Sequence, residues 1–287
     1  MILINNNISP LPFYDDISLQ NHRKEDAFGQ IYPLVTYSNF LLPFQFLVPK
    51  RVVSIRAVKL IDYNTGSSID ITTSLKNNGL ILDKKHDSFN IVKYPGVLAI
   101  PEIKHEGFYY LEIQASGDVA IFYSEVFSIT NDVSNCIELR YASSHNFELK
   151  KGIVDFSDNF YFKCYLHTQI GKPEYTFEEE VTERMGYSFI ESQVSKKIYR
   201  FTVLAPEYLC DALRIVRFCD NKRIKSGRHI YDLTTFSMEP KWEEQGDLAA
   251  IECEFETDTV IANIGGYEKA LSLGDFNSDY NNDFKIK

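Results

Sequence analysis

Alternating Asp and Asn residues near the C-terminus are the side chains best spaced to bind a cation. They stand at every second position, as the first ligands of a calcium-binding loop do, at Asp275, Asn277, Asp279, Asn281 and Asp283. Such a loop also needs a glycine for its sharp turn and a bidentate glutamate at its end. This sequence has Tyr280 and Ile286 at those two positions. We therefore expect no metal site, and we interpret the segment as a solvated or docking tail.

Two groups of glutamates could perform acid–base chemistry. One comprises residues 178–180 and Glu183, and the other alternates along residues 252–256. Two carboxylates can hydrolyse a glycoside when they face each other about 5 to 9 Å apart in a cleft. Unpaired glutamates are almost always solvated, so an exposed charged face is the simpler interpretation.

No other catalytic pattern is present. The sequence has no G-x-S-x-G, P-loop or G-x-G-x-x-G motif. Its histidines lack the H-x-x-x-H or H-x-H spacing of a metal site, and they stand at His22, His86, His105, His145, His167 and His229. The chain is therefore predicted not to be an enzyme, with no catalytic residue, no metal ligand and no cofactor.

Trp242 and the cysteines are the remaining chemically distinctive side chains. Trp242 could be a sugar-stacking platform, an interface anchor or a residue at the edge of its own core. The odd number of cysteines and the absence of any C-x-x-C favour reduced thiols from a cytosolic folding compartment. They are Cys136, Cys164, Cys210, Cys219 and Cys253.

One helix is expected in a chain that otherwise has the pattern of strands. Tyr199, Phe201 and Val203 alternate with more polar residues, as in a half-buried strand. The period then changes, because Pro206 suits a first helical turn and apolar residues follow at helical spacing over residues 206–220. An apolar stripe of this kind usually packs on its own sheet, and docking on a neighbouring subunit is the alternative.

The rest of the chain predicts an all-β fold. Residues 51–62 form a strand, residues 107–129 form a hairpin around Gly117, and residues 248–258 alternate as a half-buried strand. The polar stretch at residues 130–135 is a candidate boundary. We predict two β-sandwich or barrel-like domains at residues 1–132 and 133–266, the second with the helix, and a polar acidic tail at residues 267–287.

Composition and charge exclude several classes of function. A formal net charge of −10 argues against binding to a phosphate backbone, so nucleic acid is not an expected partner. The first residues lack the positive region of a secretory signal, and no apolar run approaches the length of a membrane span. Phe and Tyr number 21 and 18, which favours strands and contact surfaces.

Three long stretches of the second half of the chain are distinctive as sequences: GKPEYTFEEEVTERMGYSF, KIYRFTVLAPEYLCDALRIVRF and YDLTTFSMEPKWEEQGDLAAIECEFETDTVI. They resemble uncharacterised proteins of the tail gene modules of bacteriophages and prophages of Bacteroides-type bacteria, and the resemblance covers about residues 124–266. It implies a structural protein of the virion tail, in the hub, the baseplate or an adaptor, made in the host cytoplasm. The implied partners are other copies of the chain and other tail proteins. The alternative is an adsorption module that binds a host-surface glycan.

Assembly into a ring would require complementary patches on each copy. The candidates are the aromatic stretch at residues 32–46, Trp242 and the tail, because a long segment laid over a neighbour buries a large area. The residues expected at these interfaces are Tyr32, Tyr37, Phe40, Phe44, Phe46, Trp242, Tyr267, Phe276, Tyr280 and Phe284.

Overall fold

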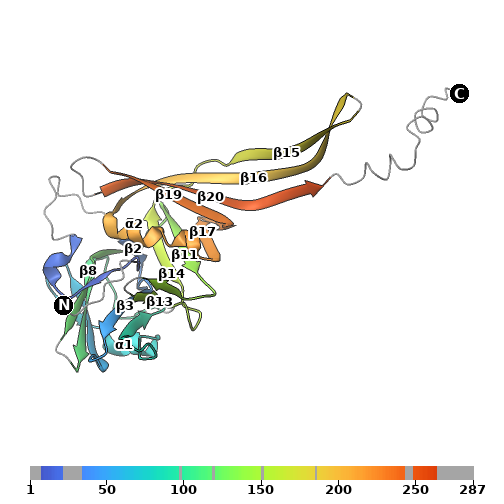
Figure 1. Ribbon diagram of the computed structural model, residues 1–287. Coiled ribbons are helices and arrows are strands. Elements are labelled where there is room, and N and C mark those ends of the chain that lie inside the picture. The colour runs from blue at the N-terminus through green and yellow to red at the C-terminus, as the bar shows by residue number, and fades with distance from the viewer. Residues whose placement is uncertain are drawn as a thin grey trace.

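The computed structural model describes residues 8–21, 34–96, 99–117, 120–149, 152–184, 186–242 and 248–263. Strands form most of this part of the chain, so the predicted all-β class is confirmed. Figure 1 shows a body built from several sheets and a long β-ribbon that projects from it.

The largest sheet has eleven strands and forms the centre of the body. Its pairings are antiparallel except for β2 with β10, which run parallel. The strands are β1 (Phe13–Tyr14), β2 (Leu34–Tyr37), β4 (Ser54–Asp62), β5 (Ser68–Asp70), β8 (Gly107–Ser116), β9 (Ile121–Ser124), β10 (Phe127–Thr130), β11 (Cys136–Ala142), β14 (Phe162–His167), β17 (Asn221–Ser226) and β18 (His229–Asp232).

The predicted hairpin at residues 107–129 is present, with a break in its returning strand. β9 and β10 pair with successive parts of β8, and a one-residue irregularity at Glu125 separates them. The Glu125 side chain is fully buried and accepts hydrogen bonds from the Tyr14 hydroxyl and the Asn21 backbone N–H, at 3.1 and 2.8 Å. A buried carboxylate needs such donors, so the break is where this charge is accommodated.

A smaller three-stranded sheet packs on the main sheet and forms a sandwich. Its strands are β3 (Phe44–Pro49), β7 (Phe89–Tyr94) and β6 (Ile81–Asp83). The Phe46 ring stacks on Phe13 at 4.2 Å and contacts Phe122 at 5.4 Å, so rings from the two sheets interdigitate. A two-stranded hairpin, β12 (Phe147–Leu149) and β13 (Gly152–Val154), lies beside them.

Two short helices lie between strands of these sheets, η1 (Ile17–Leu19) between β1 and β2 and α1 (Thr72–Asn77) between β5 and β6. The 3-10 helix η1 is capped by Asp16, whose carboxylate accepts from the Ser18 N–H. The helix α1, which the sequence pattern did not predict, buries Leu75.

The predicted helix at residues 206–220 is shorter in the structure than its apolar pattern. It comprises α2 (Glu207–Leu213) and a 3-10 turn, η3 (Val216–Phe218). Arg214 and Ile215 keep helical backbone angles, while the hydrogen bonds tighten from i, i+4 to i, i+3 spacing. The stripe from Tyr208 to Val216 is therefore still buried, and the prediction that it packs on its own fold is confirmed.

The predicted division near residue 132 does not divide the core. β2 pairs with β10 on one side and with β14 on the other, so the main sheet is continuous across that position. One cluster of buried apolar residues extends from Ile8 to Phe255. Two separately closed cores were expected because local patterns cannot show pairing between strands that are far apart in the sequence.

Candidate interaction surface

A four-stranded sheet forms the projecting ribbon, and it contains the longest strands of the protein. Its order is β15 (Glu174–Arg184), β16 (Tyr187–Pro206), β20 (Leu248–Asn263) and β19 (Thr235–Trp242). At about 3.3 Å per residue, the 20 residues of β16 span roughly 65 Å. We call its outer part, residues 174–198 and 257–263, the β arm; it leaves the body as a ribbon of at most three strands (Figure 1).

The base of this ribbon is fixed in the core. Tyr199, Phe201 and Val203 are buried and alternate with exposed residues, as the sequence predicts. The Tyr199 ring stacks on Phe255 of β20 at 5.3 Å and meets Tyr231 of β18 edge-on at 4.9 Å. The predicted alternation in residues 248–258 is also confirmed over Ile251–Phe255, and β20 continues to Asn263.

One face of the ribbon carries paired charges. Arg200 bridges Glu174 and Glu254 at 2.6 and 2.7 Å, and Lys196 pairs with Glu178 at 2.7 Å. The hydrogen bond to Glu178 raises the pKa of Lys196 above its ordinary value of 10.5. These exposed pairs add little stability, but they make this face a solvated one.

The opposite face exposes apolar side chains. Tyr175 and Phe177 of β15 lie across from Lys197 and Ser195, on the side where Tyr199 enters the core. They continue the apolar line of the core beyond the body, and they are 57% and 60% exposed. An apolar strip that is continuous with a core but uncovered marks an interaction surface.

The tip of the arm exposes further apolar side chains, on both faces of the hairpin. Val181 and Ile190 face each other across the hairpin on the same face as Phe177, and both are exposed. Tyr187 begins β16 just beyond the turn, is 70% exposed, and pairs with Arg184, so it lies on the opposite face. We call Val181, Tyr187 and Ile190 the arm tip.

The sequence pattern contained the signal for this arm. In EYTFEEEVTER, apolar residues recur at positions 175, 177 and 181, which is the period of a strand, and Gly186 follows as a turn residue. The number of glutamates suggested a solvated stretch, so β15 and the outer half of β16 were not predicted. The acidic groups instead serve as cross-strand partners, with Glu179 accepting from Gln193 and Glu180 from Ser192.

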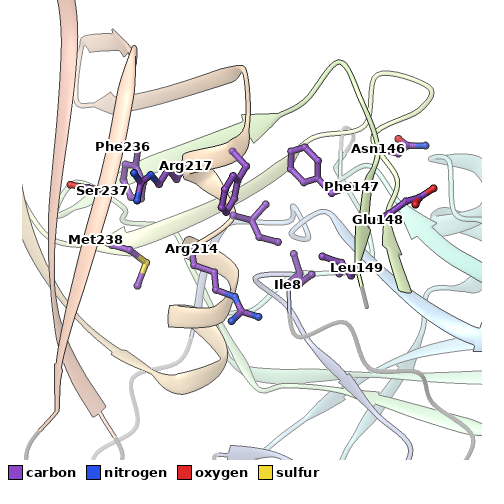
Figure 2. A pocket seen from close by; sticks show the side chains of 12 residues that line it. Ile8, Asn146, Phe147, Glu148, Leu149, Arg214, Arg217, Phe236, Ser237 and Met238 are labelled. Carbon is purple, nitrogen blue, oxygen red and sulfur yellow. The ribbon is translucent and has the colours of Figure 1, made fainter. Parts of the chain in front are cut away.

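A groove in the body is a second candidate surface. It has a volume of ≈ 910 Å³ and lies between β12, the α2–η3 segment and β19, and we call it the η3 groove. Figure 2 shows Arg217, Phe236 and Met238 on one side of it, and Phe147 and Leu149 on the other. Ile8, Asn146, Glu148, Arg214, Ile215, Phe218 and Ser237 complete its lining.

The predicted interface residues divide into three groups. Tyr37 and Trp242 are exposed, and Phe40 is half-buried. Phe44 and Phe46 are buried inside the sandwich, so their prediction as interface residues is wrong; the small sheet packs its rings against Phe13 and Phe122. Tyr32, Tyr267, Phe276, Tyr280 and Phe284 lie outside the described residues, as do the whole acidic tail and the alternating Asp and Asn residues.

Burial disfavours the ionised form of the thiols in the body. The five cysteines are free, and burial raises the pKa of Cys164 and of Cys219 to about 12. Within the ranges that the structure describes, no three His, Cys, Asp or Glu side chains are grouped as metal ligands would be. Across the same ranges, no helix has the length and apolar character needed to cross a bilayer.

Comparison with known proteins found no matching family model, curated protein or solved structure.

Proposed function

We propose that the chain is a non-enzymatic structural component of a bacteriophage virion tail, in the hub, the baseplate or an adaptor. It acts by assembling into a ring with further copies of itself and with other tail proteins. The β arm is the observation that supports assembly. The resemblance of the three sequence stretches quoted above supports the assignment to a virion tail.

The arm supports assembly because it has no core of its own. A narrow ribbon gains independent stability only when an apolar face is covered. Here one face is solvated by ion pairs, and the other exposes Tyr175 and Phe177 without a covering element among the described residues. A neighbouring subunit would cover that face, and rotation about a tail axis would repeat the contact around a ring.

A shortened arm tests this proposal. Glu178 and Val194 face each other across β15 and β16, so residues 179–193 can be replaced by Asn-Gly, which closes a two-residue hairpin. The shortened protein should remain folded by circular dichroism, because the residues removed lie outside the core. It should lose the high-mass species of the full chain in light scattering and negative-stain images.

A point variant and a matched control separate assembly from solubility. Phe177→Lys places a charge on the apolar face of the arm, and Val53→Lys makes the same change at another exposed apolar position, in the body. We expect assembly to fail only in the first. A shortened-arm protein that still forms the native ring would overturn arm-mediated assembly.

A host-glycan-binding adsorption module is the alternative function. The exposure of Trp242 at the end of β19 favours it, because an exposed aromatic ring can stack on a sugar. Retention of the protein on a host-polysaccharide column, lost in Trp242→Ala, would support this alternative.

A further inference from the structure

The η3 groove combines apolar walls with positive charge. Phe218 projects from η3 with 70% of its surface exposed, although the groove also contains the buried Phe236. Arg214 and Arg217 stand beside them and outnumber the single acidic residue, Glu148. Arg214 pairs with Asp211 at 3.3 Å, whereas no ion pair within the described residues involves Arg217. The groove therefore suits an apolar group with acidic neighbours.

The tip of the β arm has that chemistry. Residues 174–195 contain six glutamates and one basic residue, Arg184. Within this acidic segment the tip exposes Val181 and Ile190 on one face and Tyr187 on the other, so a groove that takes in the end of the hairpin can contact all three. We propose that the arm tip of one copy binds in the η3 groove of a second copy, an inference that rests on the proposed arm-mediated assembly and names its contact.

The arm cannot reach the groove of its own chain. β16 runs without interruption from the tip to Pro206, paired with β15 on one side and with β20 on the other. The groove lies against the body at β19, whereas the tip lies at the far end of the ribbon (Figure 1). Bending the tip back would break the β16–β20 ladder, so the contact is between copies.

Electrostatics favours this contact over pairing between two arms. Two arms that met along β15 would bring the five glutamates of that strand in one copy against the same five of another, and only Glu174 and Glu178 of these have a cation partner among the described residues; such like-charge contacts are disfavoured. Against the groove, the same glutamates face two arginines. The contact should therefore weaken as salt concentration rises.

The size of the groove is also suitable. Its ≈ 910 Å³ is at the upper end of the roughly 300–1,000 Å³ of sites that enclose small ligands, so it can admit the side chains of a hairpin tip. Arm and groove are different surfaces, so the contact is heterologous. Repeated from copy to copy, it closes a ring or extends a filament.

Two complementary variants of the full-length chain test the contact. Tyr187→Asp alters the tip and leaves the groove intact, and Phe218→Asp alters the groove and leaves the tip intact. Both residues are 70% exposed, so both variants should fold. Each variant alone should be monomeric by light scattering at a concentration where the wild-type chain assembles. An equimolar mixture should form a 1:1 dimer, because the intact tip of the Phe218→Asp variant can bind the intact groove of the Tyr187→Asp variant.

Each other outcome overturns a different statement. If Phe218→Asp assembles and Tyr187→Asp does not, the arm binds elsewhere, and only the groove assignment fails. If Tyr187→Asp assembles and Phe218→Asp does not, another segment occupies the groove. If the mixture stays monomeric, the two surfaces do not meet, and if the wild-type chain is monomeric, self-assembly through the arm is itself wrong.

A charge exchange provides the second measurement. Glu183, beside the tip, and Arg217, in the groove, are both exposed, so reversing either charge leaves the core unchanged. Glu183→Arg or Arg217→Glu alone should reduce assembly about tenfold or more, which corresponds to one close charge pair. The double variant should recover most of the loss, and no recovery would exclude this pairing.

Discussion

A buried ion pair fixes the small sheet to the rest of the body, and its removal should be costly. Lys93 of β7 and Asp155, which follows β13, are 4% and 6% exposed, with Nζ 3.1 Å from Oδ2. The ammonium group also donates to the Ser157 carbonyl at 2.8 Å, and the carboxylate accepts from the Ser157 N–H at 2.8 Å and from its hydroxyl at 2.9 Å.

Replacing Asp155 by Asn removes the negative charge and preserves the shape. The Lys93 ammonium then stays buried, and the one carboxylate left within ion-pair distance among the described residues is that of the exposed Asp158, at 4.0 Å. Breaking one side of a buried pair typically costs about 3–5 kcal/mol, and we expect Asp155→Asn to lower the free energy of unfolding by that amount.

The double variant Lys93→Met/Asp155→Asn leaves neither charge of this pair buried. It should therefore be more stable than Asp155→Asn alone.

The pH dependence has a definite sign. Burial raises the pKa of Asp155, but the hydrogen bonds from Ser157 and the ammonium of Lys93 outweigh it, and the pKa lies below its ordinary value of 3.8. A carboxyl with a depressed pKa in the folded protein stabilises the fold above its unfolded pKa and loses this effect as pH falls through the folded value. The difference between wild type and Asp155→Asn should thus be constant above about pH 5 and shrink below about pH 4.

Urea unfolding followed by circular dichroism at pH 7, 5 and 3 measures these differences. The control is Glu112→Gln, because the Lys59–Glu112 pair is longer, at 3.6 Å, and its side chains are 36% and 18% exposed. That change should cost at most about 1 kcal/mol. A loss of less than about 1 kcal/mol in Asp155→Asn, or a double variant no more stable than it, would refute the reasoning.

Two further predictions concern local features of the body, the backbone at Gly117 and the reactivity of the thiols. Gly117 has φ +98°, and a Cβ there would lie 2.1 Å from the Arg51 carbonyl oxygen. Gly117→Ala should therefore lower the free energy of unfolding by about 2–5 kcal/mol, because the alanine strains the left-handed backbone and overpacks the site. Gly66→Ala, at φ +71° with nothing near its Cβ, should cost only about 1–2 kcal/mol, and equal unfolding midpoints for the two would contradict this account. Burial raises the pKa of all five thiols, but only Cys136 is partly exposed. Thiol titration with Ellman's reagent at pH 8 should therefore label Cys136 before the other four, and faster reaction of another thiol in the folded protein would be inconsistent with this packing.

Local sequence patterns were sufficient to predict the strands that bury one face and expose the other. The alternation at residues 251–255 and the hairpin around Gly117 were predicted because one face of each packs on the core. The interface residues Phe44 and Phe46 were misassigned because β3 is buried on both faces, by the main sheet on one and by the region of β13 on the other, which is a long-range arrangement. The parallel pairing of β2 with β10 was likewise not visible in any local pattern.

The sequence analysis did not predict the β arm, and the reason for this is related to the proposed role of the arm in assembly. Its glutamates resemble a solvated loop, yet a long edge strand needs such charges to avoid indiscriminate pairing with other edges. β15 is an edge strand of eleven residues, and every copy would present the same open edge. The five glutamates of β15, of which Glu174 and Glu178 are in ion pairs, disfavour contact between two such edges, while the exposed Tyr187 remains available to a surface that offers positive charge. In this interpretation, the acidity that hides the arm in the sequence also selects the arginine-lined groove over a second arm.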